Sequence, residues 1–177
     1  AGEVVFYTAM VGYIESLTDP SYTGQILVPT FPMIGNYGVP DDSKTEEINN
    51  NYESNKIHAS GLIISDYSAE YSHWNADKSL SDWLKENDVP GLFGIDTRAL
   101  TKILREKGSM LGKIEFEDEP IEFYDPNSEN LVAKASIDEV LTYGKGDHKV
   151  LLIDCGTKNN IIRCLLNRGA SVTRVPW

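Results

Sequence analysis

The stretch KVLLIDCGTKNNIIRCLLNRGASVTRVPW, residues 149–177, decides the fold class at its end of the chain. The apolar residues of 149–156 predict a buried strand, and 159–169 predict a helix with Gly169 just past its last turn. Residues 171–177 predict a second strand. A strand, a helix and a strand joined by short loops form a βαβ unit, so a parallel, doubly wound α/β sheet begins here. Because two strands and one helix cannot bury both faces of such a sheet, we expect this domain to continue past Trp177.

The charge of the chain changes sign where this unit starts. Up to Asp147 the sequence holds 11 Lys and Arg against 26 Asp and Glu, whereas the residues from His148 onward hold five against one. Such a switch is typical of a domain boundary. We therefore expect a first domain over residues 1–147, which includes a connector, and the start of a second domain over residues 148–177.

The first domain mixes strand and helix signals. Helices are predicted over residues 79–88, capped by Ser79, and over residues 96–108, capped by Asp96 or Thr97. Pro29 indicates the edge of the sheet or the end of a strand. Strands are predicted over five ranges: 4–6, 24–31, 57–67, 89–96 and 109–123. A single domain with many strands and a few helices belongs to the α+β class.

Two segments lack a regular pattern. Residues 41–56, DDSKTEEINNNYESNK, are polar and have no apolar stripe, so they predict a solvated loop or a weak helix. Residues 124–148 run irregularly through an Asp-Pro turn and a Gly-Lys-Gly sequence. We interpret this second segment as the connector between the two domains.

Composition excludes several classes of protein. The net charge of −11 makes nucleic acid or an anionic membrane a poor partner, and no apolar run approaches the roughly 18 residues that a membrane span needs. Two cysteines form no disulfide framework, which gives no indication of secretion. His58, His73 and His148 have no metal-ligand spacing, so we expect no metal site and a packed or surface position for His58.

The loop after the strand of residues 149–156 is the best local candidate for chemistry. Cys155 follows a strand and precedes a helix, but the glycines that flank a nucleophile on such a turn are missing, so a structural role is favoured. Cys164 falls within the apolar pattern of the helix and is expected to pack. Gly156 permits an unusual backbone angle, and the helix start after it could hold an anion. Lys158 and Asn160 could instead cap the helix and contact the partner domain.

A second unusual stretch is DPSYTGQILVPTFPMIGNYG, residues 19–38, where turn residues alternate with polar side chains. Together with four further landmarks it resembles one family, the small subunit of glutamine-dependent carbamoyl-phosphate synthase. The resemblance covers essentially the whole chain. The other landmarks are GEVVFYTAMVGYIESLT, GIDTRALTKILREKGSMLG, DPNSENLV and IDCGTKNNIIRCLLNRGASVTRVPW.

The resemblance implies a fold and a binding site. It implies a swivelling β/β/α first domain, followed by the first βαβ unit of a flavodoxin-like class I glutaminase domain. It assigns contact with glutamine to Ser21, whose hydroxyl can both donate and accept a hydrogen bond. Asp19, Pro20 and Tyr22 would set the turn that aims Ser21. Gly35, Asn36 and Gly38 would shape the neighbouring loop. Contact between the domains would be made by the loop with Asp154, Gly156, Lys158 and Asn160.

The resemblance also implies a reaction. A thiolate attacks glutamine, and the released ammonia reacts with bicarbonate and two ATP to give carbamoyl phosphate. The nucleophile and its catalytic partners would lie beyond Trp177. We therefore expect no catalytic residue in this chain and no glutaminase activity of this chain alone. Cys155 does not correspond to the nucleophilic cysteine of the family. ATP and magnesium would bind a large subunit or a fused synthetase module. That module, glutamine and the rest of the glutaminase domain would be the partners.

Alternatives remain open at this point. The enzyme could serve pyrimidine synthesis or an arginine or urea pathway, in the cytoplasm or in the mitochondrial matrix. In ammonia-dependent relatives this region is a non-catalytic module for assembly and regulation, and residues 112–127 and 143–149 are similar to that branch. Retention of Ser21 favours glutamine use. A separate metabolite-binding protein with the same fold is disfavoured by the open sheet edge at the end of the chain.

Overall fold

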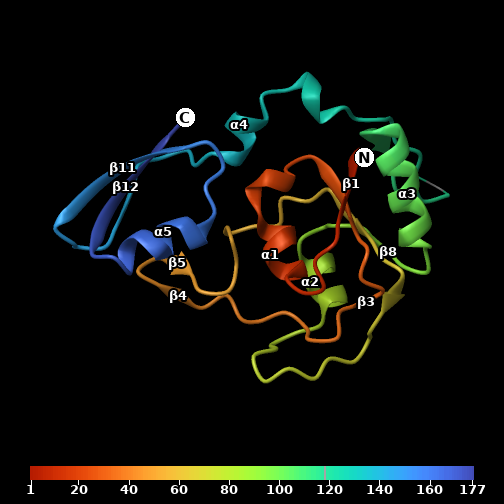
Figure 1. Ribbon diagram of the computed structural model, residues 1–177, viewed down its shortest axis with the longest axis horizontal. Coiled ribbons are helices and arrows are strands. Elements are labelled where there is room, and N and C mark those ends of the chain that lie inside the picture. The colour runs from red at the N-terminus through yellow and green to blue at the C-terminus, as the bar shows by residue number, and fades with distance from the viewer. Residues whose placement is uncertain (118) are drawn as a thin grey trace.

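The computed structural model describes residues 1–117 and 119–177. Figure 1 shows two groups of elements, a larger group that contains the N-terminus and a smaller group formed by the last part of the chain. Several sheets and helices are mixed along the sequence, which agrees with the predicted α+β class. None of the helices in the described ranges has the length and apolar character that crossing a bilayer requires.

The larger group is called the first domain below, and the smaller group is called the second domain. The first is built on a five-stranded sheet in the order β8-β6-β2-β1-β9. All neighbouring pairs are parallel except β1 with β9. The strands are short: β1 (Gly2–Tyr7), β2 (Gln25–Pro29), β6 (Gly61–Ile63), β8 (Gly91–Leu92) and β9 (Met110–Gly112). The predicted strands exist, although most are shorter than predicted. Of the predicted strand over 109–123 only β9 forms, and Asp118 lies outside the described residues.

Strand β2 lies at the centre of this sheet, which explains its continuous apolar run. Ile26, Leu27 and Val28 are at most 1% exposed, because both faces of the strand are covered. Pro29 ends the strand opposite Tyr7, so it marks a strand end and not a sheet edge.

Helices cover both faces of the sheet. On one face Leu104 of α3 (Thr97–Lys107) packs with Ile26 and Val28. On the other face Leu27 packs with residues of α1 (Tyr13–Thr18) and α2 (Leu80–Glu86). The predicted caps are confirmed: Ser79 accepts the N–H of Asp82 at 3.0 Å, and Asp96 accepts that of Ala99 at 2.9 Å.

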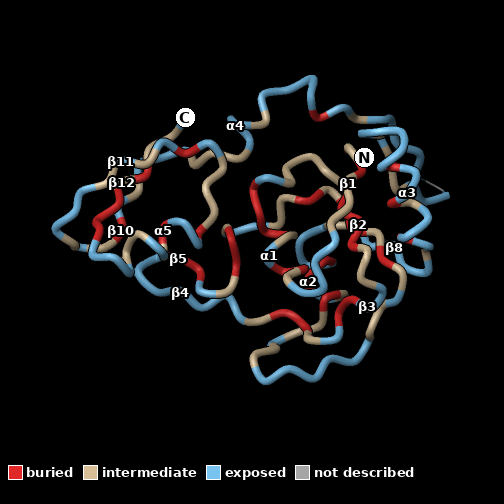
Figure 2. The backbone as a smooth tube through the Cα atoms, in the orientation of Figure 1, coloured by how far each residue is buried: buried red, intermediate tan, exposed pale blue. Residues whose placement is uncertain are grey.

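The prediction for residues 41–56 was wrong. The segment forms a hairpin of β4 (Lys44–Thr45) and β5 (Ile48–Asn49), and Ile48, Asn49 and Tyr52 are all less than 9% exposed. Ile48 packs in the core of the second domain, while the ring of Tyr52 lies 5.4 Å from that of Trp83 in α2. The apolar residues are too sparse to form a periodic stripe, yet each is buried against an element distant in sequence. Figure 2 shows the resulting run of buried residues between the two groups.

The second sheet confirms the strand-helix-strand pattern. β11 (His148–Asp154) and β12 (Ala170–Pro176) are parallel, and α5 (Asn159–Leu166) connects them. A third strand, β10 (Leu141–Tyr143), pairs antiparallel with β12 from within the expected connector. The connector also holds η2 (Pro126–Ser128) and α4 (Leu131–Ala135), and the remaining strands β3 (Met33–Ile34) and β7 (Asp66–Tyr67) form a separate pair.

Helix α5 covers one face of this sheet. Ile162 and Val172 are fully buried between helix and sheet, whereas Leu151 and Ile153 on the other face are more than 60% exposed. Cys164 is exposed, so the prediction that it packs was wrong. It lies two residues after Ile162, and 100° of rotation per residue carries it to the opposite side of the helix.

Candidate functional site

The turn that carries Ser21 follows directly on α1. Residues Pro20–Tyr22 form a single 3-10 turn, η1, and Asp19 caps it by accepting the N–H of Ser21 on Oδ1 at 2.9 Å. At its other end Thr23 donates its N–H and its hydroxyl to the carbonyl oxygen of Pro20, at 3.2 and 2.7 Å. Ser21 is exposed at the top of this turn, while Tyr22 packs against the core, and burial raises the pKa of its phenol. Both ends of the turn are therefore fixed, and the serine points outward.

Asp19 connects this turn to the second domain. Its second oxygen, Oδ2, pairs with Nζ of Lys158 at 2.6 Å, and this hydrogen bond raises the pKa of the lysine. The carboxylate is only 9% exposed, so water competes weakly with both of its partners. The structure thus brings together Asp19, Ser21 and Lys158, three of the residues that the sequence analysis selected.

The backbone of the two domains is close at Gly156. Its φ of +97° lies in the region that favours glycine, and a Cβ there would be 3.2 Å from the Cβ atoms of Pro20 and Ala135. A side chain at this position would push the loop away from the Ser21 turn. Pro20 and Gly156 therefore meet across the contact between the domains.

Asp154 shapes that loop from within the second domain. It is fully buried, accepts the N–H groups of Gly156, Thr157 and Ile137, and pairs with Arg174 at 2.8 Å. Burial by itself would raise the pKa of Asp154, but the hydrogen bonds from Thr157, Arg174 and Ile137 outweigh it and hold that pKa below its ordinary value. The aspartate keeps the loop in the shape that lets Gly156 and Lys158 reach the first domain.

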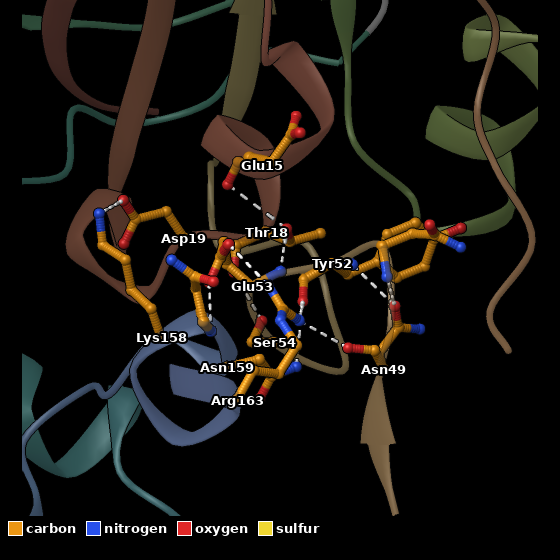
Figure 3. Close-up of polar contacts among 12 residues, drawn as sticks. Glu15, Thr18, Asp19, Asn49, Tyr52, Glu53, Ser54, Lys158, Asn159 and Arg163 are labelled. Atoms are coloured by element: carbon orange, nitrogen blue, oxygen red, sulfur yellow. Dashed lines mark hydrogen bonds and ion pairs between the residues drawn. The ribbon is translucent and has the colours of Figure 1, made fainter. Parts of the chain in front are cut away.

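The start of α5 is held by a residue that the sequence analysis missed. Lys158, at the N-cap, makes no side-chain cap, and Glu53 of the first domain takes its place (Figure 3). The carbonyl oxygen of Glu53 accepts the N–H of Asn159 at 2.8 Å, and its Oε2 accepts that of Asn160 at 2.9 Å. A carboxylate is favourable there because the start of a helix carries partial positive charge.

Arg163, one turn further along α5, completes this contact. Its Nη2 pairs with Oε1 of Glu53 at 3.1 Å, and its Nη1 donates to the carbonyl oxygens of Asn49 and Tyr52 at 2.7 and 3.2 Å (Figure 3). Asn159 also donates its side-chain amide to Tyr52. The hairpin that was expected to be solvated is thus docked on α5 by its main chain. No local pattern reveals Glu53, because it is one acidic residue in a polar stretch and the residues that its oxygens contact lie more than 100 positions away.

Comparison with known proteins identifies the family. The family model of the carbamoyl-phosphate synthase small chain, CPSase domain, matches residues 1–114. The chain belongs to this small-chain family. It is 55% identical over its whole length to "Carbamoyl-phosphate synthase [ammonia], mitochondrial" of Homo sapiens. Identity is 52% to "Multifunctional protein pyr1-3" of Dictyostelium discoideum and 50% to "Multifunctional protein CAD" of Squalus acanthias, again over the whole chain. The chain spans 12%, 9% and 8% of these three relatives.

The small-chain match and the contact between the domains overlap only in part. Asp19, Ser21 and Glu53 lie inside the range matched by the carbamoyl-phosphate synthase model, whereas Lys158 and Arg163 lie outside it. The relatives align with both sides. The contact therefore joins the part of the chain that the family model matches to a second part, which also aligns with the relatives.

The loop with Gly35 and Asn36 lies at the opposite end of α1 from Ser21. Tyr37 accepts the N–H groups of Gly12 and Tyr13 on its phenol oxygen, and Tyr13 donates its own hydroxyl to the carbonyl oxygen of Gly38 at 2.7 Å. These contacts hold the loop at the start of the helix, whereas Ser21 follows its end. A role of Gly35 and Asn36 in shaping the glutamine pocket stays a prediction.

Proposed function

We propose that this chain is part of a glutamine-dependent carbamoyl-phosphate synthase and that Ser21 contacts the glutamine. The observation that carries the proposal is the exposed Ser21 on a turn fixed from both domains, through Asp19 and Lys158. A serine hydroxyl suits the charged end of an amino acid, because it can donate to the carboxylate and accept from the ammonium group. Family membership supports the general activity.

The chain would contribute binding and not bond breaking. Its turn and the loop of residues 154–158 would form one wall of the pocket. The thiolate that attacks glutamine would come from the rest of the glutaminase domain, and ATP and magnesium would bind the synthetase module. Asp19, buried between Ser21 and Lys158, would hold the hydroxyl at a set distance from the second domain.

An ammonia-dependent enzyme is the second candidate. The human relative and that of Aquarana catesbeiana, each 55% identical, both bear the name "Carbamoyl-phosphate synthase [ammonia], mitochondrial". In such an enzyme the same contacts would hold the domains together without a glutamine site. The first candidate fits a cytoplasmic enzyme of pyrimidine synthesis, and the second fits a mitochondrial enzyme of an arginine or urea pathway.

One measurement separates the two candidates. The full-length enzyme is assayed for carbamoyl phosphate with bicarbonate and ATP, once with glutamine and once with ammonia as nitrogen donor. We expect saturable activity with glutamine at concentrations where ammonia gives little. Activity with ammonia alone would overturn the glutamine proposal and establish the second candidate. The 177-residue chain alone should release no glutamate from glutamine, and measurable release would show that the nucleophile lies within it.

A further inference from the structure

The hydroxyl of Thr23 lies between the Ser21 turn and His58. Thr23 Oγ1 is 2.7 Å from the carbonyl oxygen of Pro20 and 2.9 Å from Nδ1 of His58. A carbonyl oxygen only accepts, so the single hydroxyl hydrogen of Thr23 is donated to Pro20. The contact with His58 therefore requires a hydrogen on Nδ1 of the imidazole. The geometry fixes the tautomer: Nδ1–H donates to Thr23.

The surroundings of His58 keep its ring neutral near pH 7. Burial and, to a smaller extent, the charge of Lys56 lower the pKa of His58 to about 4, against the opposing effect of Asp19 and Asp154. A neutral imidazole carries one N–H group, and the contact with Thr23 uses it.

The main chain around His58 also supports the turn, on its other side. The N–H of His58 donates to the carbonyl oxygen of Leu17 at 2.9 Å, in the last turn of α1. The hydroxyl of Ser54 donates to the carbonyl oxygen of Thr18 at 2.7 Å. The segment 53–58 thus runs beside the chain that leads into the Ser21 turn. His58 therefore contacts that chain at two points: its N–H bonds to Leu17 before the turn, and its ring contacts Thr23 after the turn.

We propose that His58 is a positioning residue for the glutamine site, holding the Ser21 turn closed through Thr23. The inference rests on the proposed function, since it concerns the same serine. Without the donor on residue 58, the hydroxyl of Thr23 is free to rotate away from Pro20, and Thr23 then closes its end of the turn only through its longer N–H contact with Pro20, of 3.2 Å. Ser21 would then sample several orientations, and glutamine would bind less tightly while the synthetase reaction with ammonia continued.

The test uses four single variants of the full-length enzyme and one double variant, in which His58→Leu and Thr23→Val are combined. His58→Leu and Thr23→Val remove the donor and the hydroxyl while keeping similar volume. His58→Asn restores a donor, because the side-chain nitrogen of asparagine is bonded to Cγ as Nδ1 is in histidine. His73→Leu is the control, since His73 lies in an exposed loop. Initial rates are measured against glutamine and, separately, against ammonia.

We expect His58→Leu and Thr23→Val each to raise KM for glutamine about five- to tenfold, the loss of one neutral hydrogen bond, with ammonia-dependent rates unchanged. The double variant should be no worse than the worse single variant, because the two residues act through one contact. His58→Asn should bring KM back to within about twofold of the parent. An unchanged KM in His58→Leu, additive effects in the double variant, a failed rescue or an equal loss with ammonia would each overturn the inference.

Ser21→Ala, assayed alongside, separates this inference from the proposed function. If Ser21→Ala raises KM for glutamine and His58→Leu does not, only the positioning role of His58 fails. If Ser21→Ala leaves KM unchanged, Ser21 does not bind glutamine and both fail.

Discussion

Glu53 and Asn160 form a helix cap across the two domains: the carboxylate of Glu53 accepts the N–H of Asn160, the second residue of a helix that starts more than 100 residues later. The same carboxylate pairs with Arg163, so one side chain both caps α5 and anchors it. Caps are normally supplied by the residue just before the helix. Here the stability of the start of α5 depends on the first domain.

Replacement of Glu53 by alanine should loosen the first turn of α5. The cap is lost and Arg163 is left without its carboxylate, so we expect backbone amides of residues 159–163 in the full-length protein to exchange about 5- to 30-fold faster, the effect of about 1–2 kcal/mol. Hydrogen exchange with mass spectrometry measures this. Glu53→Gln, which keeps an acceptor oxygen, should fall between parent and alanine. Glu70→Ala, at an exposed glutamate, is the control, and equal exchange in both alanine variants would argue against the cap.

Replacement of Ser21 by alanine should affect glutamine use alone. Loss of a hydrogen bond to a charged group of the substrate predicts a rise in KM for glutamine of about tenfold or more. Rates with ammonia should stay at the parent value, because the turn is held by Asp19 and Thr23 and not by the serine hydroxyl. Ser72→Ala, at another exposed serine, provides the matched control. Equal losses with both nitrogen donors would mean that Ser21 acts through folding.

Alanine variants at Gly156 and Gly94 separate two costs in stability: that of backbone strain and that of a steric clash with neighbouring side chains. Both have a positive φ, +97° and +83°, but a Cβ at Gly156 meets Pro20 and Ala135 whereas one at Gly94 meets nothing within 4 Å. Alanine at either site should cost about 1 kcal/mol of backbone strain. Gly156→Ala should lower the melting temperature of the full-length protein further than Gly94→Ala. Equal melting temperatures would indicate that the loop and Pro20 can separate without cost.

His58 predicts a dependence of stability on pH. Because burial lowers its pKa from 6.5 to about 4 in the folded protein, the unfolded chain binds a proton there between these values and the folded chain does not. Stability should therefore fall as the pH drops from 6.5 towards 4. His58→Asn removes this contribution, so its loss of stability over the same range should be smaller. Thermal unfolding at several pH values measures how the stability of parent and variant depends on pH. An equal loss of stability in both proteins between pH 6.5 and 4 would refute the prediction.

The elements that could be predicted from sequence depend on neighbours along the chain. Ser79 and Asp96 cap helices through N–H groups three residues away, and the parallel unit at the end of the chain follows from short loops between strongly apolar segments. Such signals lie within a window of a few residues. The turn residues Asp19 and Ser21 also interact locally, although their link to glutamine came from family resemblance alone.

The features that were missed depend on distant partners. Ile48 and Tyr52 look like isolated apolar residues in a polar loop, and only the second domain and α2 explain their burial. Glu53 has no local signature because the three residues that its oxygens contact all belong to α5. His58 was expected to pack or to lie at the surface, and no local pattern shows that its Nδ1 lies 2.9 Å from the hydroxyl of a threonine 35 positions away.

The cap across the domains has a consequence for the order of events during synthesis. A helix of eight residues is too short to persist in water without tertiary support. The ribosome releases Glu53 well before Asn160, so the first domain can fold and present the carboxylate before α5 emerges. We expect the first domain to serve as the template on which the second one nucleates. A substitution that weakens the Glu53 cap would then slow the folding of the second domain, even where the finished protein remains folded.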